Sequence, residues 1–175
     1  MKRTILFIVI SVIACTAIAA QRIKSGPADS QTRAIEDRMA IKELVDTFSI
    51  LADKKDTKAQ VLLFTSNGRV KTYRNGSEVS NLTGRDKMET AFAAFLKNFD
   101  TVYHFNGQHA IRLNGDDAAG TLYCLVTLIG PENGKRMITT IGVIYNDEYV
   151  RENGRWLIAK RTSYFTWQNK SELQQ

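Results

Sequence analysis

The sequence predicts an α+β domain in which three helices pack on one face of a curved, mostly antiparallel sheet. Two observations lead to this prediction. Apolar residues recur at three- and four-residue spacing in three segments between residues 32 and 99, whereas the chain after Phe99 has the two-residue period of strands. Asn-Gly pairs at 114–115, 133–134 and 153–154 then divide this second half, because Asn-Gly between alternating residues is a strong hairpin signal.

The first twenty residues have the pattern of a secretory signal peptide. Lys2-Arg3 is a basic start, residues 4–13 are apolar, and Ala17-Ile18-Ala19 is a small-residue cleavage pattern. The apolar run is too short to predict a stable membrane span, although an uncleaved anchor is an alternative. Cys15 lies in a loose match to the lipidation motif of bacterial lipoproteins. We therefore expect a periplasmic or secreted protein, with a lipoprotein as the second reading.

The chain that follows has the length of one domain, and it shows neither an internal repeat nor a second-domain linker. Removing Lys2 and Arg3 lowers the net charge from +6 to +4. The basic residues are spread out without an aromatic ladder, so nucleic-acid binding is not expected. Cys124 alone cannot form an internal disulfide, and the domain must depend on its core.

The helical half follows a polar segment, residues 21–31, which we expect to be a mobile linker before a single domain at 32–170. A first helix begins near Thr32 and ends near residues 53–56. A short second helix covers 57–64, a hairpin turned by Asn75-Gly76 covers 69–82, and a third helix follows Thr83. The first helix carries an apolar stripe of Ile41, Leu44, Val45, Phe48, Leu51 and Ala52.

The sheet half begins with a long hairpin, residues 101–130, followed by strands at 136–152 and 156–167. His104 and Asn106 share one face of the first arm, and a polar face of this kind is solvated or lines a pocket. Gly107 allows a bulge that would reset the alternation beyond it, and we assign His109 a structural role. Cys124 alternates with apolar neighbours and is predicted to be a core residue with a raised thiol pKa.

The order of these elements resembles the SnoaL-like branch of the NTF2-like superfamily, which includes scytalone dehydratase and bile acid 7-alpha dehydratase. Each motif is weak, but their order and spacing together are specific. The matching motifs are Leu51-Ala52-Asp53 with Asp56, Leu63-Phe64-Thr65, Gly84-Arg85-Asp86, Tyr103-His104-Phe105, Leu113-Asn114-Gly115-Asp116-Asp117-Ala118-Ala119-Gly120, Tyr149-Val150-Arg151, and Gly154-Arg155-Trp156-Leu157-Ile158-Ala159-Lys160-Arg161.

The resemblance implies a cone-shaped fold with an internal pocket for a small hydrophobic ligand, and a homodimer formed through the sheet face. It implies that Asp53, at the end of the first helix, pairs with His104. It further implies substrate contacts for Tyr73 and Arg161. Without the resemblance, the helical periodicity of the sequence would leave Asp53 in solvent at a helix C-terminus, where the macrodipole disfavours an anion.

Three positions depart from the dehydratase pattern, one of them Asn67, where the family usually has an acid after Leu-Phe-Thr. The returning strand of the long hairpin, where the dehydratases have a second acid–base residue, offers only Thr127. A tyrosine of the dehydratase pocket is replaced by Phe48 or Ala52. We keep Asn106, Thr127 and Phe48 as candidate substrate contacts.

The sequence therefore supports two hypotheses. In the first, Asp53 and His104 form a proton-transfer dyad of a dehydratase or isomerase, since a carboxylate on one imidazole nitrogen leaves the other free as a base. In the second, the domain binds a small molecule or dimerises without turnover. Neither a metal-ligand spacing nor a Gly-rich phosphate loop is present, so we expect no metal and no cofactor.

Overall fold

The computed structural model describes residues 27–174. The predicted signal peptide at 1–20, Cys15 and residues 21–26 of the predicted linker lie outside them. The elements in chain order are α1 (Pro27–Asp53), α2 (Thr57–Val61), β1 (Phe64–Arg74), β2 (Ser77–Thr83), α3 (Arg85–Leu96), β3 (Thr101–Asn114), β4 (Asp117–Glu132), β5 (Lys135–Glu152) and β6 (Arg155–Glu172). This arrangement confirms the predicted α+β class.

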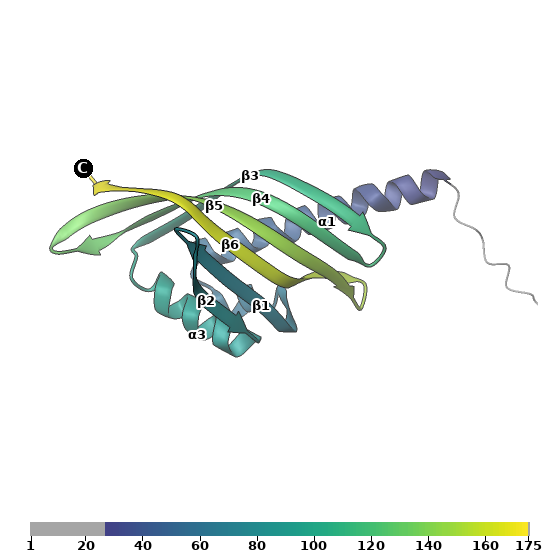
Figure 1. The fold of residues 1–175 in the computed structure, drawn as a ribbon, viewed down its shortest axis with the longest axis horizontal. Coiled ribbons are helices and arrows are strands. Elements are labelled where there is room, and N and C mark those ends of the chain that lie inside the picture. The colour runs from purple at the N-terminus through teal and green to yellow at the C-terminus, as the bar shows by residue number, and fades with distance from the viewer. Residues whose placement is uncertain (1–26, 175) are drawn as a thin grey trace, which may run out of the picture.

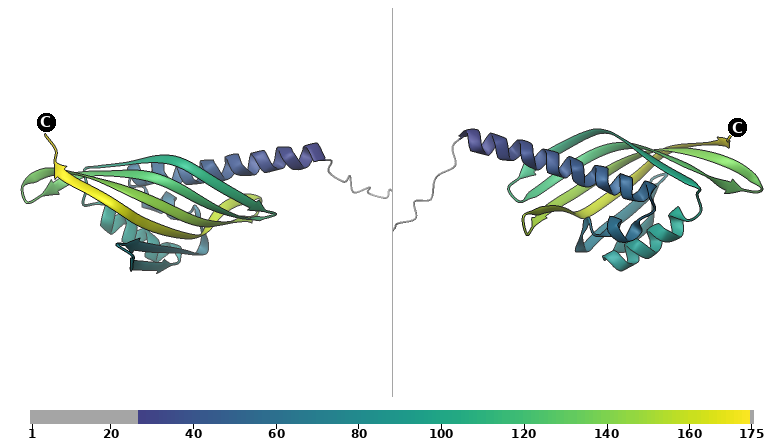
Figure 2. Two further views of the ribbon diagram at one scale, coloured as in Figure 1. Left: turned by 45° about the horizontal axis from the view of Figure 1, so that its top comes forward. Right: turned by 180° about the vertical axis from the view of Figure 1, so that it is seen from behind.

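The six strands form one curved sheet in the order β2-β1-β6-β5-β4-β3, and the three helices lie on one side of it (Figures 1 and 2). Every neighbouring pair is antiparallel except β1 and β6, which are parallel. The long strands β3 to β6 form a continuous meander. Within residues 27–174, the structure contains no helix long and apolar enough to span a membrane.

Asn-Gly turns set the strand order, as the sequence predicts. Asn75, Asn133 and Asn153 have φ values of 51°, 52° and 51°, and the glycine after each also has a positive φ. Two successive residues with positive φ define the type I′ turn, whose twist matches that of the flanking strands. These turns therefore direct β1 into β2, β4 into β5 and β5 into β6.

Several element boundaries differ from the sequence prediction: α2 ends at Val61 instead of residue 64, and β6 continues to Glu172 instead of ending at residue 167. α1 begins at Pro27, so residues 27–31 are helical and not part of a linker. Proline suits the first helical position, and these first turns are exposed, so no apolar stripe marks them in the sequence. β1 begins at Phe64, and residues 65–68 are absorbed as an irregularity of its register with β6.

The predicted bulge in β3 is present. Asn106 pairs with Cys124, but the next pair is His109 with Leu122, so β3 holds one residue more than β4 at this point. The extra residue brings His109 onto the same face as Asn106. Cys124 itself is buried in the core, as predicted, and burial raises the pKa of its thiol to about 12.

A polar clasp joins the middle of α1 to the far end of the sheet. Buried Asp37 accepts hydrogen bonds from the Arg151 guanidinium and from Trp156 Nε1, the latter at 3.2 Å. Arg151 also stacks over the Trp156 ring at 4.5 Å and contacts exposed Asp116. Burial alone would raise the pKa of Asp37, but these hydrogen bonds and the charge of Arg151 outweigh it and lower that pKa.

We expect this clasp to make stability fall in acid. A carboxyl group with a lowered folded-state pKa stabilises the fold above its usual pKa of about 4, and the contribution is lost as pH falls through the folded value. Asp37→Asn should therefore cost about 1–3 kcal/mol at pH 7 and clearly less at pH 3. Thermal melts followed by circular dichroism at both pH values measure the difference.

Asp116→Asn is the matched control, because Asp116 contacts the same arginine from an exposed position. Its cost should stay below about 1 kcal/mol at both pH values. An Asp37→Asn cost that is the same at pH 7 and pH 3 would contradict the expectation.

Candidate active site

The last residue of α1 meets the beginning of β3. Asp53 Oδ1 lies 2.7 Å from His104 Nδ1, and the backbone N–H of His104 donates to Asp53 Oδ2 at 3.3 Å. The imidazole is almost fully enclosed, with 8% of its side chain exposed, against 24% for Asp53. The structure thus brings together the two residues that the sequence nominated as a dyad.

This geometry fixes how the imidazole can act. The carboxylate can only accept, so the short contact assigns the Nδ1 hydrogen to the side of His104 that faces Asp53. Nε2 then carries a free lone pair and can accept a proton. Because Asp53 is also held by the backbone of the same residue, the ring and the carboxylate keep a fixed relative position.

His104 lines a partly open cavity of about 280 Å³ between the helices and the concave face of the sheet. Most of its lining is apolar and comes from α1, α3 and the strands, while α2 contributes Gln60. The apolar lining residues are Phe48, Ala52, Val70, Leu82, Ala91, Phe92, Phe95, Leu96, Val126, Leu128, Ile141 and Phe165. A cavity of this size and composition suits a small hydrophobic molecule.

Arg161 on β6 provides a buried cation at the same cavity. Its guanidinium lies between the rings of Phe48 and Tyr145, 4.3 Å from each centroid. Asp147, its cross-strand partner, accepts from Nε at 2.8 Å and from Nη2 at 2.6 Å. Burial alone would lower the pKa of Arg161, but the Asp147 carboxylate outweighs it and raises that pKa, so the cation persists. Nη1 has no hydrogen-bond partner.

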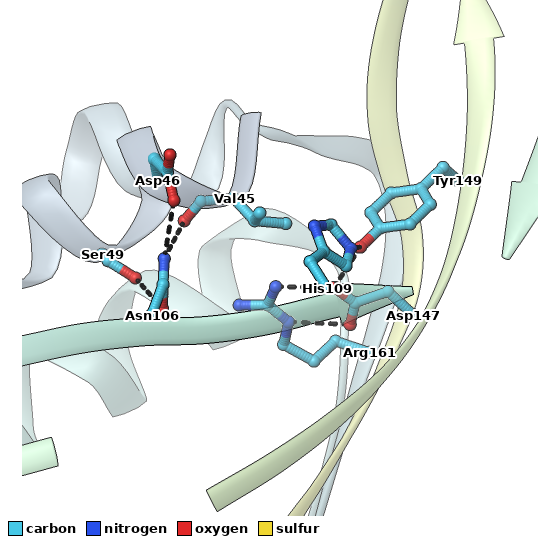
Figure 3. A network of polar contacts seen from close by, with 8 residues as sticks. All are labelled: Val45, Asp46, Ser49, Asn106, His109, Asp147, Tyr149 and Arg161. Atoms are coloured by element: carbon cyan, nitrogen blue, oxygen red, sulfur yellow. Dashed lines mark hydrogen bonds and ion pairs between the residues drawn. The ribbon is translucent and has the colours of Figure 1, made fainter. Parts of the chain in front are cut away.

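A line of hydrogen bonds continues from this ion pair to His109 (Figure 3). Tyr149 donates to Asp147 Oδ2 at 2.8 Å, so its oxygen accepts from His109 Nε2 at 3.2 Å. Burial lowers the pKa of His109 and so favours the neutral ring, although the charge of Asp147 acts in the opposite direction. His109 thus supports the Asp147–Arg161 pair from behind and stands apart from the cavity lining.

The predicted substrate contacts separate into two groups. Phe48 and Arg161 line the cavity. Asn106 is not among the cavity-lining residues. Its side-chain NH₂ donates to Asp46 Oδ1 at 3.0 Å and its side-chain oxygen accepts from Ser49, and these two bonds fasten β3 to α1 (Figure 3).

Tyr73 and Thr127 lie on the outer face of the sheet, and their predicted contacts with a ligand in the cavity do not fit this geometry. Tyr73 donates to Glu78 at 2.9 Å and stacks on Tyr164. Thr127 pairs with exposed Tyr103, while its neighbours in β4 point inward. The reason is strand parity, since adjacent residues of a strand face opposite sides.

The cavity also has polar lining residues that sequence reasoning missed. Thr72 and Arg74 flank Tyr73, and strand alternation could have identified them had Tyr73 been assigned to the outer face. Gln60 had no signal in the sequence, because α2 is too short for a periodic pattern. The missed polar lining residues are Gln60, Thr72, Arg74, Ser80, Tyr145 and Ser163.

Fold and site together define a class of protein: an α+β domain with a curved, unclosed sheet and a His–Asp pair whose histidine lines a largely apolar cavity. The family model of the SnoaL-like domain matches residues 33–162. The chain therefore belongs to the SnoaL-like family, as its motifs predict. An uncharacterized protein of Mycobacterium tuberculosis is 25% identical over 128 residues, covering 73% of this chain and 84% of that protein.

Solved structures share the fold. A putative scytalone dehydratase from Novosphingobium aromaticivorans aligns with a TM-score of 0.69 at 20% identity, over 83% of this chain and 93% of that one. Hexachlorocyclohexane dehydrochlorinase LinA-type3 from Novosphingobium barchaimii aligns with a TM-score of 0.68 at 15% identity, over 81% and 94%. These likenesses confirm the NTF2-like fold.

Proposed function

We propose that this protein is a cofactor-independent enzyme of the dehydratase or isomerase type, acting on a small hydrophobic molecule. The observation that carries the proposal is the 2.7 Å contact between Asp53 and His104, whose ring lines a largely apolar cavity. In the proposed step, His104 Nε2 removes a proton from a substrate carbon, and Asp53 stabilises the resulting imidazolium. The names of the structural neighbours, a dehydratase and a dehydrochlorinase, denote eliminations that need such a proton removal.

Hydrogen–deuterium exchange tests the proton transfer without knowledge of the natural substrate. We choose 1-tetralone, a bicyclic ketone of suitable size, dissolved in D₂O and followed by proton NMR at the carbon next to the carbonyl. The wild-type protein should accelerate exchange above the buffer rate, and His104→Gln should reduce the acceleration by about 10²–10⁴-fold. His109→Gln, which changes the histidine outside the cavity lining, should keep most of it.

A second function is favoured by one observation. In β4, where the dehydratases have a further acid–base residue, the cavity meets only Val126 and Leu128. Under this alternative the domain binds a small molecule without turnover. Binding of 1-tetralone with no exchange above buffer would favour the alternative and reject the enzyme proposal.

We also propose that two copies associate through the outer face of the sheet. Phe105, Leu125 and Trp167 are 60%, 43% and 52% exposed and form one row across the sheet, with Gly142 beneath the Trp167 ring. A parallel row holds Tyr123, Ile144, Tyr164 and Tyr73. Neither row contains a charge, so two copies with the same net charge can meet there without repulsion, in a self-complementary pair.

Light scattering tests the association. The wild-type domain should have twice the mass of one chain, and Phe105→Glu with Leu125→Glu should reduce it to a single chain. Val79→Glu is the control, because Val79 is exposed on β2 outside both rows. A wild-type protein with the mass of one chain at micromolar concentration would refute the dimer.

Export is likewise a proposal, supported by the signal-peptide pattern of residues 1–20. Mass spectrometry of the protein from bacterial cell fractions should find a chain that begins near residue 20 or 21 outside the cytoplasm. Lipidated Cys15 at the terminus would identify the lipoprotein alternative, and a cytoplasmic chain beginning at Met1 would reject export.

A further inference from the structure

Gln60 is a buried polar residue of whose two polar side-chain atoms one has a hydrogen-bond partner and the other has none among the described residues. Only 2% of it is exposed, and its Nε2 donates to the backbone oxygen of Phe48 at 3.2 Å. Its Oε1 has no partner, although the side chain lines the cavity beside which His104 lies. Buried polar atoms in folded proteins are nearly always bonded, so an unpartnered acceptor at a cavity wall requires an explanation.

The orientation of this amide is determined by its surroundings. A backbone carbonyl can only accept, so the atom of Gln60 that faces the Phe48 oxygen must be the NH₂ group. The side-chain oxygen of Gln60, Oε1, is then the atom without a hydrogen-bond partner in the described part of the chain. The residue sits on α2, whose first turn is capped by the Asp56 side chain accepting from Ala59 N at 3.0 Å, so its backbone position is fixed as well.

Arg161 supplies the complementary group. Nε and Nη2 are both used by Asp147, which leaves Nη1 as an unpartnered donor, and Figure 3 shows this nitrogen pointing away from Asp147. Two residues that line the cavity therefore carry an unpaired buried atom, an acceptor at Gln60 and a donor at Arg161. No protein group within residues 27–174 pairs with either atom, so a bound molecule must supply their partners or leave them unpaired.

We propose that Gln60 is a specificity-determining residue, whose Oε1 accepts a hydrogen bond from a hydroxyl group of the substrate. The proposal rests on the proposed function, since it names the chemical class that the cavity of the dyad selects. That class is a neutral, largely hydrophobic ring compound with at least one O–H donor, and a hydroxyl oxygen can also accept from Arg161 Nη1. A compound with the donor capped by a methyl group leaves Gln60 unpaired and should bind about tenfold more weakly.

A matched pair of probes tests the proposal by isothermal titration calorimetry. We use 2-naphthol, which carries the donor, and 2-methoxynaphthalene, in which a methyl group replaces the hydroxyl hydrogen. The wild-type protein should bind 2-naphthol about tenfold more tightly. Gln60→Met, which keeps the length and removes the acceptor, should reduce this ratio to about one, whereas Gln60→Glu, which keeps an oxygen, should preserve a preference.

The ratio of two affinities in one protein is insensitive to a general loss of stability, and melting temperatures of the variants report their folding. Equal wild-type affinities for the two probes, or no binding of either, would overturn the inference without need of a variant. A tenfold preference that persists in Gln60→Met would also overturn it, because another acceptor such as His104 Nε2 would then take the hydroxyl.

The two proposals fail separately. A preference for 2-naphthol that depends on Gln60, together with no exchange of 1-tetralone above buffer, would support the role of Gln60 and reject proton transfer. Exchange that depends on His104, together with equal affinities for the two naphthalenes, would support proton transfer and reject the role of Gln60.

Discussion

Replacing Asp147 by asparagine should lower the free energy of unfolding by about 3–5 kcal/mol, because it leaves the Arg161 cation buried without a counter-charge. Arg161 and Asp147 expose only 2% and 1% of their side chains. Tyr149 also loses the charged acceptor of its hydrogen bond. For a domain of this size the loss corresponds to a melting temperature lower by roughly 6–20 °C, which circular dichroism can measure.

Glu148→Gln is the matched control for this prediction. Glu148 is the next residue of the same strand and also pairs with a cation of β6, Lys160 at 2.6 Å, but this pair is solvent-exposed. Its loss should cost no more than about 1 kcal/mol. The double variant Asp147→Asn, Arg161→Met, which removes the cation as well, should be more stable than Asp147→Asn alone. Equal costs for Asp147→Asn and Glu148→Gln would contradict the account.

The second large effect is on catalysis. Under the proposed function, Asp53→Asn should reduce the exchange of 1-tetralone by about 10²–10⁴-fold while leaving the fold intact. Asparagine is nearly isosteric and can still accept from the His104 backbone N–H. Its amide can, however, present an NH₂ to Nδ1, which moves the ring hydrogen to Nε2 and removes the base from the cavity side.

The control for the dyad is Asp46→Asn, which removes another carboxylate from α1 that is bonded to β3 through Asn106. It should leave the exchange rate within a few-fold of wild type, since Asp46 is not among the cavity-lining residues. An Asp53→Asn protein that keeps wild-type exchange would show that the carboxylate does not act on the imidazole.

Much of the architecture can be predicted from the sequence because local signals agree with it. The stripe of α1 is buried at Ile41, Val45 and Phe48, and three of the hairpin turns are Asn-Gly pairs with positive φ. The helix start at Pro27 was missed because the first turns of α1 bury no apolar face.

The site is less predictable, because its residues are brought together by tertiary structure. Helical periodicity places Asp53 off the apolar stripe, and only the packing of the α1 end against β3 turns it toward His104. Alternation also fails across the β3 bulge: Ile111 packs against the core, whereas Tyr103 and Phe105, which share its parity in the sequence, are exposed. Gln60 lacked any local pattern.

The clasp at Asp37 has a mechanical consequence for the dyad. Asp37 and Asp53 belong to the same unbroken helix, roughly 24 Å apart at 1.5 Å per residue. α1 is held near its middle at Asp37 by Arg151 and Trp156 and again at Asp46 and Ser49 by Asn106, and its last residue carries the dyad carboxylate. A small tilt at the clasp is transmitted to the contact with His104, where a displacement of about 1 Å can cost about 10²-fold in rate. We therefore expect the alignment of the dyad to depend in part on Asp37, Arg151 and Trp156, which do not line the cavity.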